Sequence, residues 1–188
     1  MTDIKKIIEI VLENKDLSKE QIYELVMNTT DTMKDISKDT IDVYTDGSSL
    51  GNPGPGGWGY VCVENNIETY SHSGSEAHST NNKMELTAAI EGLEYTKENN
   101  HSKKVVNVYT DSNYVKNGIT KWIINWKKNG WKTKQGKDVM NKDLWVRLDS
   151  IASKEIEWKW VKAHNGNYFN EKVDDLAREA AIRISKKK

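Results

Sequence analysis

The stretch Val105-Val106-Asn107-Val108-Tyr109-Thr110-Asp111 is a near-continuous run of strand-forming residues that ends in an acid. Such a run is typical of a β-strand that is buried on both faces beside a helical crossover. The preceding residues 82–99 carry apolar side chains at helical spacing and supply that crossover. This stretch therefore predicts an α/β fold with a parallel strand pair.

The flanking sequence extends this prediction in both directions. Upstream, β-rich runs at residues 41–45, 59–64 and 68–73 are separated by a Gly/Pro turn and by Asn65-Asn66, which predicts three adjacent antiparallel strands. Downstream, the patterns predict helices at 112–118, 121–128, 142–153 and 173–184, and a last strand at 155–162. We therefore expect a five-stranded mixed sheet with helices packed on both faces.

The first 40 residues differ in character from the rest of the chain. Ile4, Ile7, Ile8, Val11 and Leu12 form one helical face, and a capping box at Ser18 and Gln21 starts a second helix. A polar stretch at residues 29–40 then reads as a linker. We expect an N-terminal helical hairpin and linker at 1–40 and a catalytic domain at 41–188.

Composition excludes several classes of protein. The chain has 188 residues with 28 basic and 28 acidic side chains, so partners must be inferred from local patches. No apolar run approaches the roughly 20 residues of a membrane span, and the N-terminus lacks the apolar core of a secretory signal. One cysteine, Cys62, permits no internal disulfide. We expect a cytoplasmic protein that does not associate with membranes.

Three acids stand near the ends of the predicted elements. Asp46 follows the first strand, Asp111 follows the strand at 105–110, and Glu85 lies in the first turn of the helix at 82–99. Ligands bind at the ends of central strands in such sheets, so these carboxylates can converge. Converging carboxylates repel unless a cation or proton separates them, and oxygen ligands favour Mg²⁺ or Mn²⁺. Taken singly, each acid is more commonly a cap, a turn former or a solvated charge.

Residues 121–137 form a basic, aromatic segment, which we call the basic protrusion. It contains six Lys and no acid, interleaved with Trp122, Trp126 and Trp131. Lysines bind phosphates and exposed Trp faces pack on sugars or bases, so this composition favours a nucleic acid partner. Trp122 and Trp126, at helical spacing, are equally compatible with a buried stripe. We expect the remaining tryptophans in the core; they are Trp58, Trp145, Trp158 and Trp160.

Short segments follow one another in a specific order along the chain. They are residues 45–48 (TDGS), 52–57 (NPGPGG), 80–86 (TNNKMEL), 109–112 (YTDS), 117–120 (NGIT) with Trp122 and 125–132 (NWKKNGWK), 160–164 (WVKAH) and 170–177 (NEKVDDLA). In order and spacing, these segments resemble type 1 cellular ribonuclease H over about residues 41–184. The resemblance implies the ribonuclease H-like fold. It also implies an endonuclease that hydrolyses the RNA strand of RNA/DNA hybrids.

The resemblance implies a metal-dependent active site. The matching metal ligands are Asp46, Glu85, Asp111 and Asp174, with Asp46 bridging two Mg²⁺ ions and with Mn²⁺ as an alternative. Two such ions activate water and stabilise the leaving oxygen of a phosphodiester, which implies products with 5′-phosphate and 3′-hydroxyl ends.

The resemblance also bears on Asp174 and His164. Spacing within residues 170–177 selects Asp174 over Asp175, and a helix turns about 100° per residue, so one of the two can face the metals. His164, in a Gly-containing loop, matches the family histidine that assists proton transfer and product release.

The resemblance also implies contacts with both strands of a hybrid. The residues that match minor-groove and 2′-hydroxyl contacts are Gly47, Asn52, Asn81, Asn82 and Asn113. Thr80 and Asn141 match a pocket for a phosphate of the DNA strand, although His78 stands where some members have Arg. On the basic protrusion, Trp122 and Trp126 match a channel that packs on deoxyriboses, and Lys127 and Lys128 lie beside it.

One departure and two alternatives remain. Some family members carry a basic, aromatic hybrid-binding module at the N-terminus, but residues 1–40 are net acidic with a single aromatic residue, Tyr23. The hairpin can pack on the catalytic domain, dimerise or bind another protein; we expect a monomer. The alternatives are another nuclease of the same superfamily and a catalytically silent hybrid-binding protein. The complete basic protrusion opposes the first, and retention of the acids and His164 opposes the second.

Overall fold

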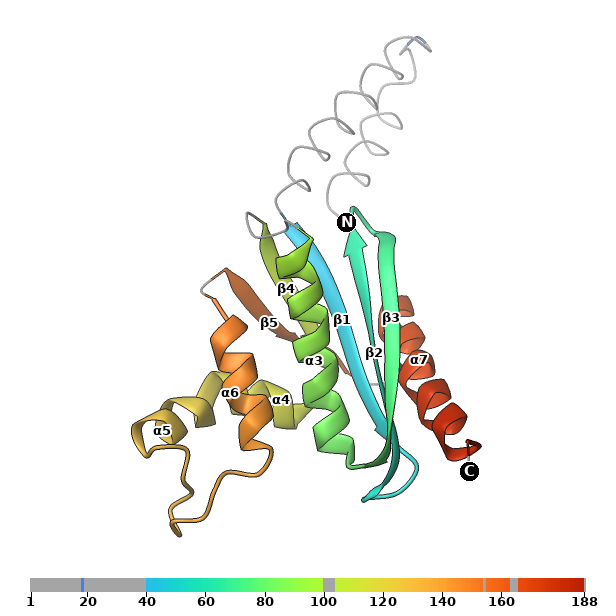
Figure 1. The fold of residues 1–188 in the computed structure, drawn as a ribbon. Coiled ribbons are helices and arrows are strands. Elements are labelled where there is room, and N and C mark those ends of the chain that lie inside the picture. The colour runs from blue at the N-terminus through green and yellow to red at the C-terminus, as the bar shows by residue number, and fades with distance from the viewer. Residues whose placement is uncertain (1–17, 19–39, 100–103, 154, 163–165, 188) are drawn as a thin grey trace. The chain divides into compact units, whose positions relative to one another are not determined.

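The described part of the chain is a five-stranded mixed sheet with helices on both faces (Figure 1). The computed structural model describes residue 18 and residues 40–99, 104–153, 155–162 and 166–187. The chain divides by its contacts into two units, Met1–Asp39 and Thr40–Lys188. The predicted N-terminal hairpin lies outside the described residues.

The elements of the second unit follow the expected order. They are β1 (Thr40–Ser49), β2 (Gly54–Glu64), β3 (Ile67–Ser79), α3 (Asn81–Glu98), β4 (Val105–Thr110), α4 (Asn113–Asn117), the π-helical turn η2 (Gly118–Trp122), α5 (Ile123–Lys128), α6 (Lys142–Ile151), β5 (Ile156–Trp160) and α7 (Tyr168–Ser185). Among these helices none is long and apolar enough to cross a membrane, a finding that concerns the described ranges alone.

The sheet order is β3-β2-β1-β4-β5. β1 pairs antiparallel with β2 and parallel with β4, and β4 pairs parallel with β5. The sheet is therefore mixed, as the sequence predicts, and β1 and β4 are its central parallel pair. Asp46 near the end of β1 and Asp111 just after β4 consequently lie at the same edge of the sheet.

The two faces of the sheet carry separate apolar cores. Val43 and Val108 point towards α3 and α6, whose buried Leu86 and Trp145 belong to the same cluster. The next residue along β1, Tyr44, points to the opposite face and joins a smaller cluster with α7. Figure 1 shows α3 and α6 on one side of the sheet and α7 on the other. Side chains that alternate along β1 thus give the sheet an apolar surface on each face, and helices pack on both.

The second and third strands are longer than the sequence predicts. β2 begins at Gly54 rather than at residue 59, and β3 continues to Ser79 rather than to residue 73. Glycine has low strand propensity, so the pattern does not reveal the start of β2. The reason for glycine is packing on α7: a Cβ at Gly57 would lie 2.1 Å from the Ala177 carbonyl oxygen.

Two helical segments also differ from expectation. The helices predicted at 112–118 and 121–128 are joined by η2 into one continuous run. α7 begins at Tyr168 rather than at residue 173, because the Asn167 side chain accepts a bond from the Asn170 N–H at 3.1 Å and caps the helix.

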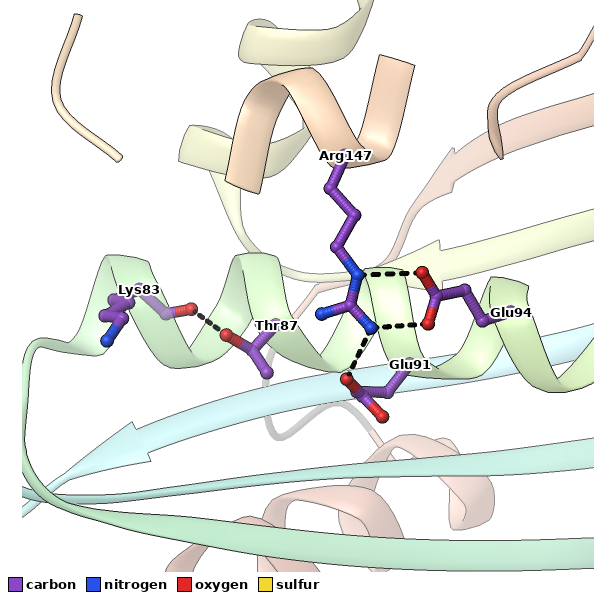
Figure 2. A network of polar contacts seen from close by, with 5 residues as sticks. All are labelled: Lys83, Thr87, Glu91, Glu94 and Arg147. Atoms are coloured by element: carbon purple, nitrogen blue, oxygen red, sulfur yellow. Dashed lines mark hydrogen bonds and ion pairs between the residues drawn. The ribbon is translucent and has the colours of Figure 1, made fainter. Parts of the chain in front are cut away.

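Ion pairs and hydrogen bonds connect α6 to α3 (Figure 2). The Arg147 guanidinium donates from Nε to Glu94 Oε1 at 2.7 Å and from Nη2 to Glu91 Oε1 at 3.1 Å, and Nη2 also bonds the second oxygen of Glu94. This two-pronged bond to Glu94 has the geometry in which Arg–carboxylate pairs are strongest. It links the helix that follows the basic protrusion to the helix that carries Glu85.

We predict that Arg147→Met lowers the free energy of unfolding by about 1 kcal/mol at low salt, and by less at high salt. Methionine keeps the aliphatic stem and removes the charge. Urea unfolding at two ionic strengths measures the effect. Arg178→Met is the control, because Arg178 makes one exposed pair with Asp175 inside α7. Equal losses in the two variants would contradict a special role for the network.

Candidate active site

Three carboxylates meet at the edge of the sheet where β1 and β4 end. Each of Asp46, Glu85 and Asp111 offers an oxygen, and these oxygens all lie within 4.8 Å of one another. Asp46 and Glu85 are buried, with 7% and 6% of their surface exposed. Glu85 lies just beyond the first turn of α3, because that helix begins one residue earlier than predicted.

Gly47 makes this convergence possible. A Cβ at Gly47 would lie 2.0 Å from the Glu85 nitrogen and 2.3 Å from the Met84 carbonyl carbon, so only glycine allows β1 to approach α3 so closely. The Gly47 N–H also lowers the pKa of the Asp46 and Glu85 carboxyls, which opposes part of the effect of their burial. The glycine at position 47 therefore allows Asp46 on β1 and Glu85 on α3 to lie close together.

The two adjacent acids of α7 face different ways. The Asp174 carboxyl acts on Asp46 and raises the pKa of that side chain. Asp175 is exposed and pairs with Arg178 instead. Asp174 is therefore the one of the two that acts on the cluster of Asp46, Glu85 and Asp111, and we call these three residues the acid cluster.

The acid cluster is electrostatically unfavourable by itself. Burial raises the pKa of the Asp46 carboxyl, and the charges of Asp111 and Asp174 raise it further. Burial likewise raises the pKa of Glu85, with Asp46 and Asp111 adding to the effect. A cation bound among these carboxylates would therefore stabilise their charged forms strongly.

The donor set fits a hard divalent cation. Glu85 Oε1 accepts a bond from Asn81 Nδ2 at 3.4 Å, whereas Glu85 Oε2 is buried and has no hydrogen-bond partner within the described ranges. A buried carboxylate oxygen without a donor is costly unless a cation satisfies it. Carboxylate oxygens are the ligands that Mg²⁺ and Mn²⁺ prefer, so these residues fit such an ion.

Trp160 is not a core residue, contrary to the expectation from the sequence. Its side chain is 44% exposed at the end of β5, and its indole N–H donates to the Asp111 carbonyl oxygen at 3.1 Å. The Lys116 ammonium lies 5.5 Å from the centre of its ring. The alternation in β5 predicts a buried Trp, but no local pattern reveals a hydrogen bond to the residue that follows β4. Of the other three, Trp145 is fully buried and Trp58 and Trp158 are partly buried.

Comparison with known proteins agrees with this geometry. The sequence model of the RNase H family matches residues 38–182. The chain belongs to the ribonuclease H family. The match spans the whole sheet, the acid cluster and nearly all of α7.

Individual ribonuclease H relatives cover the same region. The chain is 51% identical over 148 residues to Ribonuclease H of Wolbachia sp. subsp. Drosophila simulans (strain wRi), which covers 78% of this chain and 99% of that protein. It is 48% identical over 151 residues to Ribonuclease H of Francisella philomiragia, covering 80% and 96%. Among solved structures, LC9-RNase H1, described as a type 1 RNase H with the type 2 active-site motif, is 32% identical with a TM-score of 0.68. That match covers 77% of this chain and 73% of that one.

The residues matched to the minor groove lie in β1, in the turn before β2 and at the first turns of α3 and α4. Asn81 and Asn82 begin α3 and are exposed, and Asn113 begins α4 and is exposed. Asn52 is exposed in the turn before β2. Gly47 is buried, so the packing role described above adds to the contact that the resemblance implies.

The two residues matched to the phosphate pocket are held by hydrogen bonds. Thr80 caps α3, since its hydroxyl accepts from the Lys83 N–H at 3.3 Å. Asn141 precedes α6 with a left-handed backbone, φ 55°, and its side-chain amide donates to the Tyr114 hydroxyl at 3.2 Å. His78 is exposed near the end of β3.

In the basic protrusion one tryptophan is packed against the core and the other is exposed, so each of the two interpretations of the sequence applies to one of them. Trp126 packs against the core cluster and lies 5.3 Å from Trp145 between ring centres, whereas Trp122 is 39% exposed. The two together line an open cavity of about 420 Å³, whose other walls are Asn125, Asn129, Lys132, Thr133 and Lys134. Lys128 is exposed, and the Lys127 ammonium pairs with Asp149 at 2.8 Å.

The remaining predicted site residue is His164. His164 lies outside the described residues, between the end of β5 and the start of α7.

Proposed function

We propose that the chain is an endonuclease that hydrolyses the RNA strand of RNA/DNA hybrids. The observation that carries this proposal is the acid cluster at the edge of the sheet, where Glu85 Oε2 is buried and has no hydrogen-bond partner in the part of the chain that the structure describes. The family and the relatives named Ribonuclease H support the assignment of reaction and substrate.

The carboxylates of Asp46, Glu85, Asp111 and Asp174 would hold two Mg²⁺ ions, or Mn²⁺. Bound divalent ions of this kind supply an activated water and stabilise the charge that develops on a phosphodiester. The expected products carry 5′-phosphate and 3′-hydroxyl ends. His164 would assist proton transfer from its loop.

The protein's own residues would orient the hybrid. The amides of Asn52, Asn81, Asn82 and Asn113, with the main chain at Gly47, would contact the minor groove, where 2′-hydroxyls distinguish RNA from DNA. Thr80 and Asn141 would bind a phosphate of the DNA strand. Trp122 and Trp126 would pack on deoxyriboses, where an added 2′-hydroxyl is sterically excluded, and Lys127 and Lys128 would contact phosphates.

The proposal also covers the location, oligomeric state and domain organisation of the protein. We infer a cytoplasmic monomer organised as an appendage at 1–40 and a catalytic domain at 41–188. The single, buried and free Cys62 is compatible with a reducing compartment.

A substrate panel tests the proposed function. We expect the full-length protein with Mg²⁺ to cut an RNA/DNA hybrid and to leave RNA/RNA and DNA/DNA duplexes of the same sequence intact. EDTA should stop the reaction. A hybrid that binds tightly and stays whole with both Mg²⁺ and Mn²⁺ would instead support the silent binding protein. Cleavage of branched or double-stranded DNA would support another nuclease of the superfamily.

A further inference from the structure

The hydroxyl of Tyr114, in α4, makes three hydrogen bonds to residues 140–145 at the start of α6. It accepts hydrogen bonds from Asn141 Nδ2 at 3.2 Å and from Trp145 Nε1 at 3.0 Å, and it donates to the Met140 carbonyl oxygen at 3.4 Å. A hydroxyl has one proton to donate and two lone pairs to accept with, so these three contacts use its full capacity. Tyr114 therefore ties α4 to the start of α6.

The side chain of Asn141 depends on this contact for its direction. Asn141 precedes the first residue of α6, where an Asn side chain normally accepts a bond from the helix backbone. Here it makes no such capping bond, and its amide donates to Tyr114 instead. The orientation of Asn141 is consequently set by α4 rather than by the helix that Asn141 begins.

The ring of Tyr114 reaches the basic protrusion as well. It lies 6.1 Å from the Trp122 ring, edge to face, and 5.3 Å from the Trp145 ring. Tyr114 also stands three residues after Asp111, in a helix that Ser112 caps by accepting a bond from the Val115 N–H at 3.3 Å. One side chain thus touches Trp122 and Asn141 from the helix that follows an acid of the cluster.

We propose that Tyr114 is a positioning residue for binding of the DNA strand, because its hydroxyl holds the Asn141 amide in the orientation that receives a phosphate. The proposal rests on the proposed function, in which Asn141 contacts that phosphate. A side chain held in its bound orientation before the ligand arrives loses less freedom on binding, which raises affinity. Tyr114 itself touches no reacting atom.

The variant Tyr114→Phe isolates the hydroxyl, since phenylalanine keeps the ring against Trp122 and Trp145. We expect KM for the hybrid to rise roughly five- to tenfold with kcat changed less than about twofold, because an interaction made equally in the ground and transition states is lost. Asn141→Ala should raise KM similarly. The double variant should be no worse than Asn141→Ala alone, since Tyr114 acts through Asn141.

A second readout separates positioning from general loss of structure. In a series of hybrids, successive DNA phosphates are replaced one at a time by neutral methylphosphonates. The wild type should bind worst when one particular phosphate is neutral, and Tyr114→Phe should lose most of that sensitivity. Trp145→Phe is the matched control: it removes the other donor to the same hydroxyl and leaves the bond to Asn141. It should lower thermal stability but keep the phosphate profile.

The outcomes are distinguishable. An unchanged KM and phosphate profile in Tyr114→Phe, or an equal further rise in KM when it is added to Asn141→Ala, would overturn the positioning role. Failure of the wild type to cut hybrids would instead overturn the proposed function.

Discussion

Asp46→Asn abolishes hybrid cleavage and makes the metal-free protein more stable. We expect the rate to fall at least about a thousandfold, which corresponds to roughly 4 kcal/mol of activation free energy. Asp46 lies in the acid cluster beside Glu85 and Asp111, and on the proposed function its charge would hold cations there. In the absence of cations that same charge is buried among other acids. Its removal should therefore raise the free energy of unfolding by about 1–3 kcal/mol.

Single-turnover cleavage and thermal unfolding in EDTA measure the two effects on one preparation. Asp175→Asn is the control, because Asp175 is the exposed acid that pairs with Arg178 outside the cluster. It should keep wild-type activity and gain no stability. A variant Asp46→Asn that is both inactive and less stable than the wild type would argue that Asp46 is needed for folding, contrary to our account.

Gly47→Ala should cost at least about 3 kcal/mol of stability and nearly all activity. The added methyl group would meet the backbone of Met84 and Glu85 at 2.0–2.3 Å, well inside van der Waals contact. Backbone in a helix cannot move aside cheaply, so β1 and α3 must separate. That separation would also draw Asp46 away from Glu85. Urea unfolding and the rate of hybrid cleavage report the two losses.

Gly92→Ala is the comparison for this prediction. Gly92 is a buried glycine of α3, but a Cβ there would first meet Val43 Cγ1 at 2.8 Å, which is the end of a side chain. Alanine also favours the helix by about 1 kcal/mol over glycine, which offsets part of the clash. We expect a much smaller loss of stability and retained cleavage. Equal effects at both glycines would show that close approach at Gly47 has no special importance.

The fold was predictable where burial leaves a pattern in the sequence. The apolar run at β4 and the helical stripe of α3 indicate a parallel pair with a crossover, and the structure confirms both. The ends of β2 and β3 were missed. Gly56 and Gly57 occur in β2 because Met84 of α3, Ser79 of β3 and the backbone of α7 lie close to them, a tertiary reason that strand propensity does not capture. β3 is an exposed edge strand rich in Ser, His and Glu, and its sequence carries little alternation.

The acids of the candidate site were predictable from the sequence, but the residues that position the site were not. Asp46, Glu85 and Asp111 stand near element ends, and the family resemblance selects them together with Asp174. The contributions of Trp160 and Tyr114 were missed. Each acts through a hydrogen bond to a residue on another element, the first to Asp111 and the second to Asn141. Such bonds depend on the folded arrangement and leave no spacing to detect.

The most direct test of the account is strand-resolved cleavage of one RNA/DNA hybrid, labelled on both strands, by the wild type and by Asp111→Asn in Mg²⁺. We predict that the wild type cuts the RNA strand, leaves 5′-phosphate and 3′-hydroxyl ends and spares the DNA strand. Asp111→Asn should fold normally and cut neither strand. Cleavage of RNA by the variant at the wild-type rate would contradict the claim that the acid cluster is the active site.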